Sequence, residues 1–187
     1  MQPTKFQVKL YTSSGDVSLE ALIPVFHEWI REKKIADELL IDVADYAHVP
    51  QGPGVVLIGH QSDYYLDMAN DRPGLLYSRK RGFDGTFEDG LKDAFRRALG
   101  ASQLLEAEPS LGLSFDTSEV LFRVQDRLSA PNSEATFEAY QGPLTEVANG
   151  FFGASASLEH VEDAREPFSV RIQTGQSGSV ADALARA

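Results

Sequence analysis

The sequence from Glu38 to Asp67 reads ELLIDVADYAHVPQGPGVVLIGHQSDYYLD. Two runs in it, Glu38–Val49 and Val55–Asp67, are rich in the aliphatic and aromatic residues that are typical of β-strands. The residues between the runs, Pro50–Gly54, predict a rigid loop because proline and glycine interrupt regular structure. The stretch therefore predicts an antiparallel hairpin, and the next apolar run, Leu75–Arg81, extends it to a meander.

A strand and a helix precede this meander. Residues Lys5–Thr12 alternate polar and apolar side chains, as a half-buried strand does. From Ser18 onward, apolar residues follow at spacings of three and four, which predicts a helix with one buried face. Pro24 lies inside that pattern and should bend the helix or delay its regular start. Within the meander, Gly59 predicts a bulge or a close backbone approach.

Two more helices are predicted in the second half of the chain. Residues 86–108 carry an apolar stripe at helical spacing, and Thr86 with Asp89 resembles a capping box. The last helix should begin at Pro131-Asn132-Ser133, with Asn132 as its cap. Gly142-Pro143 should then break or kink it.

Two hairpins and a tail complete the pattern. Leu113–Phe115 and Val120–Leu128 predict one hairpin, with its turn at Asp116-Thr117-Ser118. Ser157–Val161 and Phe168–Gln173 predict the other hairpin. The final residues, 175–187, are small and polar and predict a frayed tail.

The elements follow the order β-α-β-β-β-α-β-β-α-β-β. Because the strands arrive in hairpins, the sheet should be largely antiparallel, with about three helices packed on one face. The sequence therefore predicts an α+β fold in a single domain over residues 1–174. An alternative is that residues 1–85 and 110–174 are similar halves joined by the helix 86–108, because SLEA at Ser18–Ala21 resembles TFEA at Thr136–Ala139.

Composition limits the classes of protein to which the chain can belong. Of its 187 residues, 42% are hydrophobic and 24% are charged, as in a folded soluble protein. No run approaches the roughly 18 apolar residues of a membrane span, and the first residues lack a signal-peptide pattern, so we expect a cytoplasmic protein without membrane contact. The net charge of −11 disfavours nucleic acid as a partner, and the lack of cysteine excludes thiolate metal sites. No motif for a nucleotide cofactor is present.

The hairpin at Glu38–Asp67 also holds the candidate catalytic residues Asp45, His60 and Asp63. If its turn centres on Gly52-Pro53, Asp45 lies opposite or diagonal to His60. A carboxylate beside an imidazole raises the basicity of the ring and fixes its tautomer. Asp63 follows His60 by three positions, and so lies on the opposite face of a regular strand. The alternative is that Asp45 and His60 form an ordinary cross-strand pair.

A divalent metal is the cofactor that this hairpin could hold. His48 and His60 would supply nitrogen ligands beside the carboxylates, although their spacing matches no standard motif. Tyr64 is a candidate ligand-binding residue in the same stretch. The alternative for the tyrosines is that they cover the edge of the core.

Arg123 and Arg127 form a second candidate site for ligand binding. If Val120–Leu128 is a regular strand, both arginines lie on one face of it. Two guanidinium groups on one face could hold a carboxylate or a phosphate by paired hydrogen bonds. The alternative is that they pair with the surplus acids of the protein itself.

Three stretches of the chain resemble a group of bacterial proteins of similar length, frequent in cyanobacteria, for which no activity is established. They are IPVFHEWI at Ile23–Ile30, the stretch Glu38–Asp67, and DRLSAPN at Asp126–Asn132. The resemblance extends from Phe6 to Gln173. It implies a bacterial cytoplasmic protein, and it implies no cofactor, substrate or catalytic residue.

The residues favour a binding or interaction protein without catalytic activity. Its exposed strand edge or open sheet face would take up a partner protein or a second copy of the chain. The alternative is a small enzyme or ligand-binding protein that uses Asp45, His48, His60 and Asp63, with or without a divalent metal.

Overall fold

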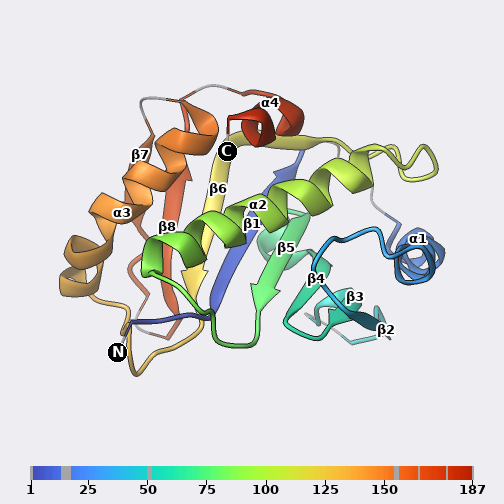
Figure 1. The fold of residues 1–187 in the computed structure, drawn as a ribbon, viewed down its shortest axis with the longest axis horizontal. Coiled ribbons are helices and arrows are strands. Elements are labelled where there is room, and N and C mark those ends of the chain that lie inside the picture. Colours follow the sequence, from blue (N-terminus) through green and yellow to red (C-terminus); the bar gives the residue numbers. More distant parts are fainter. Residues whose placement is uncertain are drawn as a thin grey trace.

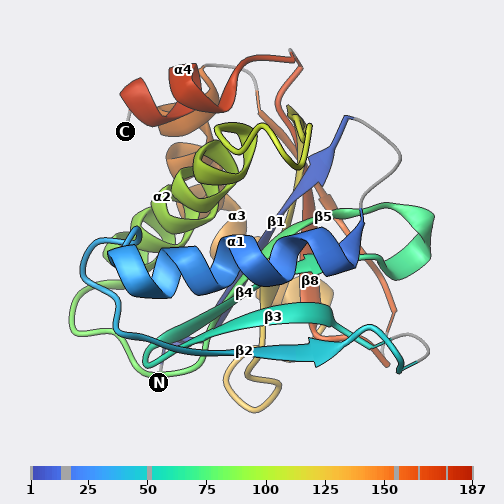
Figure 2. The same ribbon diagram turned by 90° about the vertical axis from the view of Figure 1, so that its right-hand side faces the viewer.

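The computed structural model describes residues 2–13, 18–49, 52–153, 156–163, 165–175 and 177–186. The described strands form one sheet of eight strands, and each neighbouring pair is antiparallel. Their order across the sheet is β2-β3-β4-β5-β1-β6-β8-β7. The helices pack against one face of this sheet (Figure 1, Figure 2). The predicted α+β class is therefore confirmed.

The bounds of the elements agree with most of the expected segments. The strands are β1 Phe6–Thr12, β2 Leu40–Tyr46, β3 Gly54–Gly59, β4 Ser62–Asp67, β5 Gly74–Arg79, β6 Phe115–Val124, β7 Ser157–His160 and β8 Phe168–Gln173. The helices are α1 Leu19–Glu32, α2 Phe87–Glu106, α3 Glu134–Phe152 and α4 Val180–Ala185, with a short 3-10 helix η1 at Ala69–Asp71.

The core lies between the sheet and its helices. In the central strand β1, Phe6, Val8 and Leu10 are fully buried on the face that α2 covers. Figure 1 shows α2 crossing the middle of the sheet. Helix α1 contacts β2 and β3, and it buries Phe26 and Trp29 there. The apolar faces of the strands and of the helices thus pack together in one layer.

The run Val55–Asp67 forms two strands, β3 and β4, where the sequence predicted one. The strands are joined by a tight turn at His60 and Gln61. A Cβ at Gly59 would lie 2.5 Å from the carbonyl oxygen of Ser62, so a larger residue would clash with the returning chain. The predicted close approach at Gly59 is confirmed, and it marks the end of a strand.

The hairpin predicted at Leu113–Leu128 is instead the single strand β6. Its register with β1 shifts so that Leu10 pairs with Val120, whereas Tyr11 pairs with Asp116. The Asp116 carboxylate accepts hydrogen bonds from the amide and hydroxyl of Ser118, at 2.8 and 2.7 Å. This local turn makes a bulge in β6 and does not reverse the chain.

Two helices also differ from expectation. Helix α3 continues through Pro143 without a break, and Leu144 and Val147 beyond it are buried in the core. In place of a frayed tail, α4 packs against α2 and α3 and buries Val180 and Ala183. Tertiary packing therefore outweighs the local preferences of both segments. Among the described residues, no helix combines the length and the apolar character that crossing a bilayer requires.

The sheet order relates the two halves of the chain. From β1 the chain passes through α1 to the outer strand β2, and it then meanders inward to β5, which pairs with β1. From β6 it passes through α3 to the outer strand β7 and returns in β8, which pairs with β6. This parallel in topology is compatible with duplicated halves, and the duplication stays a prediction.

Candidate interaction surface

The predicted hairpin cluster is not assembled, because the register differs from the expected one. Asp45 pairs with Val55, and the amide of His60 donates to the carbonyl of Leu39. The prediction that Asp45 lies opposite His60 is therefore wrong. The Gly/Pro loop on which it rested includes Pro50 and Gln51, which lie outside the described residues.

The two histidines of the hairpin lie at opposite ends of β3. His48 follows β2 in the loop that leads to β3, and His60 begins the turn after β3. Strand β3 has six residues, which at about 3.3 Å per residue separates its ends by roughly 20 Å. One metal ion cannot contact both imidazoles at that separation.

Asp63 and Tyr64 occupy opposite faces of β4. Asp63 forms an ion pair with Lys80 at 2.6 Å, on the face opposite the helices. Tyr64 is fully buried in the core beside Tyr77, and burial raises the pKa of its hydroxyl. Neither side chain shares a site with Asp45 or His60, because Asp63 is engaged in the ion pair and Tyr64 lies in the core.

Arg123 and Arg127 are also apart. Arg127 lies in an exposed turn after β6 ends, whereas Arg123 is half-buried on the open face of the sheet. There it lines a groove of about 570 Å³, together with Lys9, Arg72 and Arg171. The Nε atom of Arg123 is buried and has no hydrogen-bond partner among the described residues.

The other cations of the groove are matched by acids. Arg72 lies 2.7 Å from Glu119, and Arg171 lies 2.7 Å from Glu159. Lys9 donates to Asp67 at 2.7 Å, and burial lowers the pKa of its ammonium group although Asp67 opposes that effect. Three of the four basic side chains that line the groove thus pair with the protein's own acids. Arg123 is the basic group of the groove that could bind an anionic ligand.

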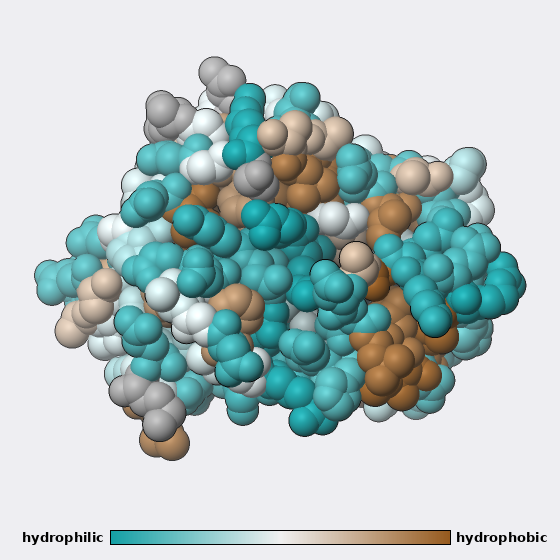
Figure 3. Space-filling view, viewed as in Figure 1, coloured by the Kyte–Doolittle hydropathy of each residue, from teal (hydrophilic) through white to brown (hydrophobic). Residues whose placement is uncertain are grey.

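Exposed apolar side chains gather at the opposite end of the sheet, along the outer strand β2. Leu39 is 68% exposed, Ile41 54%, Tyr46 44% and Val49 40%. Figure 3 shows hydrophobic surface gathered over β2 and β3, beside α1. We call these four residues the edge patch. Leu39 and Ile41 lie at the start of β2, and Tyr46 and Val49 lie at and beyond its end, so the patch runs along the strand. Isolated exposed apolar residues are ordinary, but several along one edge indicate an interaction site.

The edge patch follows from the alternation of β2 and from a register shift inside it. Leu40 is buried and its neighbours Leu39 and Ile41 are exposed, as alternate positions of a regular strand are. The pairing with β3 then skips a residue between Leu40 and Asp42, so that Asp42 is exposed and Val43 packs against the core. The sequence predicts a strand here, and it does not specify which face of that strand is covered.

Strand β2 also has one side that pairs with no other described strand, whereas β3 pairs with the opposite side. The amide of Val43 lies on the unpaired side, and it donates to the Asp42 carboxylate at 2.8 Å. Because amides alternate along a strand, the amide of Asp45 faces the same side. An edge of this kind can accept another extended chain.

Charge is distributed unevenly between this end of the sheet and the rest. From Ile35 to Asp71 there is no lysine or arginine. The acids in that stretch are Asp37, Glu38, Asp42, Asp45, Asp63, Asp67 and Asp71. Glu38, Asp63 and Asp67 pair with Arg97, Lys80 and Lys9, which leaves the exposed Asp42 and Asp45 as the negative charges of β2 itself.

A hollow of about 730 Å³ extends the edge patch. Tyr46 and Val49 line it together with Leu19, Gly54 and Met68. Met68 is 38% exposed, so another large apolar side chain adjoins the patch. Asp67, Asn70 and Asp71 line the hollow as well, so the surface is a strand edge with a recess of mixed character at one end.

No family model, curated protein or solved structure matches the chain.

Proposed function

We propose that this protein is a binding protein that takes up an extended segment of a partner protein along β2. The observation that carries the proposal is the coincidence of the edge patch with the free edge of the sheet. Strand addition uses both features, since backbone hydrogen bonds supply affinity and side-chain contacts supply specificity.

The charge around β2 defines the chemistry of the partner. A segment with alternating apolar and basic side chains would bury the edge patch and would offset the acids of this region. A lysine or arginine opposite Asp42 would also draw its carboxylate away from the amide of Val43 and free that amide for the partner. A second copy of the chain fits less well, because two acidic edges would meet.

The test is a selection of displayed random short peptides on the full-length protein. Peptides that alternate apolar and basic residues should be enriched. Ile41→Lys should weaken their binding about tenfold or more, since burying such a side chain contributes about 1.5–3 kcal/mol. Leu128→Lys is the matched control, because Leu128 is 98% exposed and lies in the turn after β6.

A second pair of variants isolates the backbone contribution. Asp45→Pro removes an amide on the free side of β2, whereas Asp45→Asn removes only the charge. Strand addition predicts a larger loss of binding for the proline variant. Equal binding by both variants, or enriched peptides that bind Ile41→Lys as well as the parent, would contradict the proposal. A dimer that Ile41→Lys abolishes would show that the partner is a second copy.

A further inference from the structure

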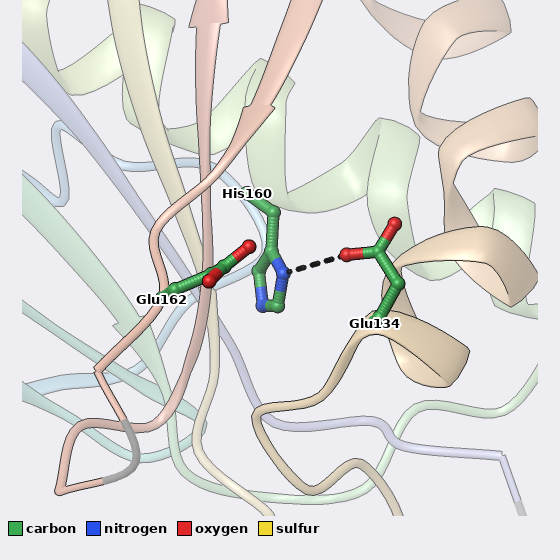
Figure 4. Close-up of side chains that lie close together, drawn as sticks. All are labelled: Glu134, His160 and Glu162. Atoms are coloured by element: carbon green, nitrogen blue, oxygen red, sulfur yellow. Dashed lines mark ion pairs between the residues drawn. The ribbon is translucent and has the colours of Figure 1, made fainter.

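A histidine and two glutamates converge at the edge of the sheet opposite β2. Glu134 is the first residue of α3, His160 ends β7, and Glu162 follows two positions later. One ligand atom from each lies within 4.8 Å of the others (Figure 4). Both carboxylates are exposed, whereas the side chain of His160 is only 7% exposed. The cluster thus joins a buried imidazole to solvent-facing acids.

Asn132 determines which nitrogen of His160 carries the proton. Its Nδ2 donates to the carbonyls of Val161 and Asp163, at 3.0 and 2.8 Å. This fixes the amide orientation, so Oδ1 of Asn132 must accept the 2.7 Å hydrogen bond from Nε2 of His160. Nε2 is therefore protonated, and Nδ1 is left to face the glutamates.

The expected cap of α3 is corrected at the same place. Ser133, not Asn132, caps the helix, because its hydroxyl accepts a hydrogen bond from the Thr136 amide.

Nδ1 of His160 is buried and has no hydrogen-bond partner among the described residues. The ring packs against two aromatic side chains, since Phe137 stacks on it at 5.4 Å and the centre of the Phe168 ring lies at 5.6 Å. Figure 4 shows Nδ1 directed at the Glu134 carboxylate, and the two atoms are 3.4 Å apart. In the neutral ring this places a lone pair against a carboxylate, an arrangement that repels unless a positive charge lies between.

We propose that His160 Nδ1, Glu134 and Glu162 bind a divalent transition metal ion. The donor set of one imidazole and two carboxylates suits Zn²⁺, and water would complete the coordination. The hydrogen bond from Nε2 to Asn132 is the outer contact that metal-bound imidazoles generally make. It orients the ring and leaves the metal-binding nitrogen free.

The distances agree with this assignment. Ligand atoms around a tetrahedral Zn²⁺ at 2.0–2.1 Å are about 3.3 Å apart, close to the 3.4 Å between His160 and Glu134. Glu162 follows His160 by two positions, at a tight turn in which the Asp163 amide donates to the Val161 carbonyl at 3.1 Å, and its carboxylate lies beside the imidazole (Figure 4). Glu162 is exposed and can close the remaining distance by rotating its side chain.

A metal here would join the end of β7 to the start of α3. The site goes beyond the proposed function, because β7 and β2 are the outermost strands at opposite ends of the sheet. The sequence signal for this site is His-x-Glu at the end of a strand. That motif supplies only two of the three ligands, and the third, Glu134, comes from a helix that is distant in the sequence. The search for a metal centre therefore belongs here and not in the hairpin of His48 and His60.

The test is calorimetric titration of Zn²⁺ into the chelator-treated protein, purified without a histidine tag. One equivalent should bind per chain. Glu134→Gln and Glu162→Gln should each weaken binding about tenfold or more, since even outer contacts contribute 10–100-fold in such sites. Glu138→Gln is the matched control, because Glu138 is an exposed acid one turn further along α3. These variants keep the buried ring in place and should fold.

The imidazole nitrogen resonances of His160 distinguish a metal from a proton. Zn²⁺ should shift the Nδ1 resonance at constant pH, with Nε2 still protonated. No saturable binding, equal affinity in Glu134→Gln, Glu162→Gln and the parent, or an Nδ1 resonance that responds to pH and not to Zn²⁺ would overturn the proposal. The last result would show that Nδ1 binds a proton and pairs with Glu134 as an imidazolium. Peptide binding at β2 is expected to be the same in all these variants, so the two proposals can fail separately.

Discussion

Lys9 and Asp67 form a buried ion pair on the face of the sheet opposite the helices. Nζ of Lys9 lies 2.7 Å from Oδ2 of Asp67, and the two side chains are 3% and 13% exposed. They come from β1 and β4, strands that do not pair with each other. The pair therefore connects the centre of the sheet to the half that contains the edge patch.

Removing one partner of this pair should cost more stability than removing both. Asp67→Asn leaves the Lys9 ammonium buried without its counter-charge, and we expect a loss of about 3 kcal/mol. The double variant Lys9→Met with Asp67→Asn should cost less than about 1 kcal/mol, because it removes both charges together with the desolvation penalty of each. Urea unfolding of both single variants and the double variant measures this difference. A double variant less stable than Asp67→Asn would contradict it.

The protein should lose stability in alkaline solution because its tyrosines are buried. Burial raises the pKa of Tyr65 to about 12, and it raises the pKa of four other tyrosines. These are Tyr11, Tyr64, Tyr77 and Tyr140. The unfolded chain loses its phenolic protons near pH 10, whereas the folded chain keeps them. The stabilisation is complete below about pH 10 and is lost as the pH rises toward 12.

Lys9 acts in the opposite direction over part of this range. Its pKa is lowered by burial, so its contribution to stability increases with pH until the unfolded lysine titrates near 10.5. Because more tyrosines than lysines are shifted, we expect the urea midpoint to fall between about pH 9 and about pH 11. Tyr65→Phe should reduce that fall. An unchanged fall in Tyr65→Phe would show that Tyr65 does not contribute.

Gly59 should tolerate no side chain. A Cβ there would meet the Ser62 carbonyl at 2.5 Å and the Glu38 carboxylate at 2.8 Å, so Gly59→Ala should cost about 1–3 kcal/mol. Gly82→Ala is the control, because a Cβ at Gly82 meets nothing within 4 Å. Thermal unfolding of both variants provides the measurement. A loss in Gly82→Ala as large as in Gly59→Ala would show that the close approach is not the cause.

The sequence was sufficient for the fold class because periodicity depends on which residues are buried. The alternation in Lys5–Thr12 and the stripe after Ser18 both follow from one apolar layer. The register was not predictable in the same way. Asp45 pairs with Val55 because β2 ends at Tyr46, which pairs with Gly54, so the hairpin is not centred on Gly52-Pro53, and no local signal specified that centre.

The candidate sites were even less predictable from the sequence than the strand register. Asp45, His48, His60 and Asp63 are close in sequence, but β3 and β4 disperse them. Glu134 and His160 are far apart in the sequence and still meet, because α3 and β7 pack together. Sequence proximity favours the wrong histidines, since the contacts that build a site are set by packing between distant elements.

Asp42 should protect the free edge of β2 against self-association. Its carboxylate accepts the Val43 amide at 2.8 Å and places a negative charge beside Ile41, two devices that prevent edge strands from pairing with copies of themselves. Asp42→Ala frees the amide and removes the charge, so we expect a dimer that forms as protein concentration rises. Light scattering after size exclusion measures the mass. Asp71→Ala, which removes an acid outside β2, should keep the mass of the parent protein. A monomeric Asp42→Ala at the highest soluble concentration would show that other groups protect this edge.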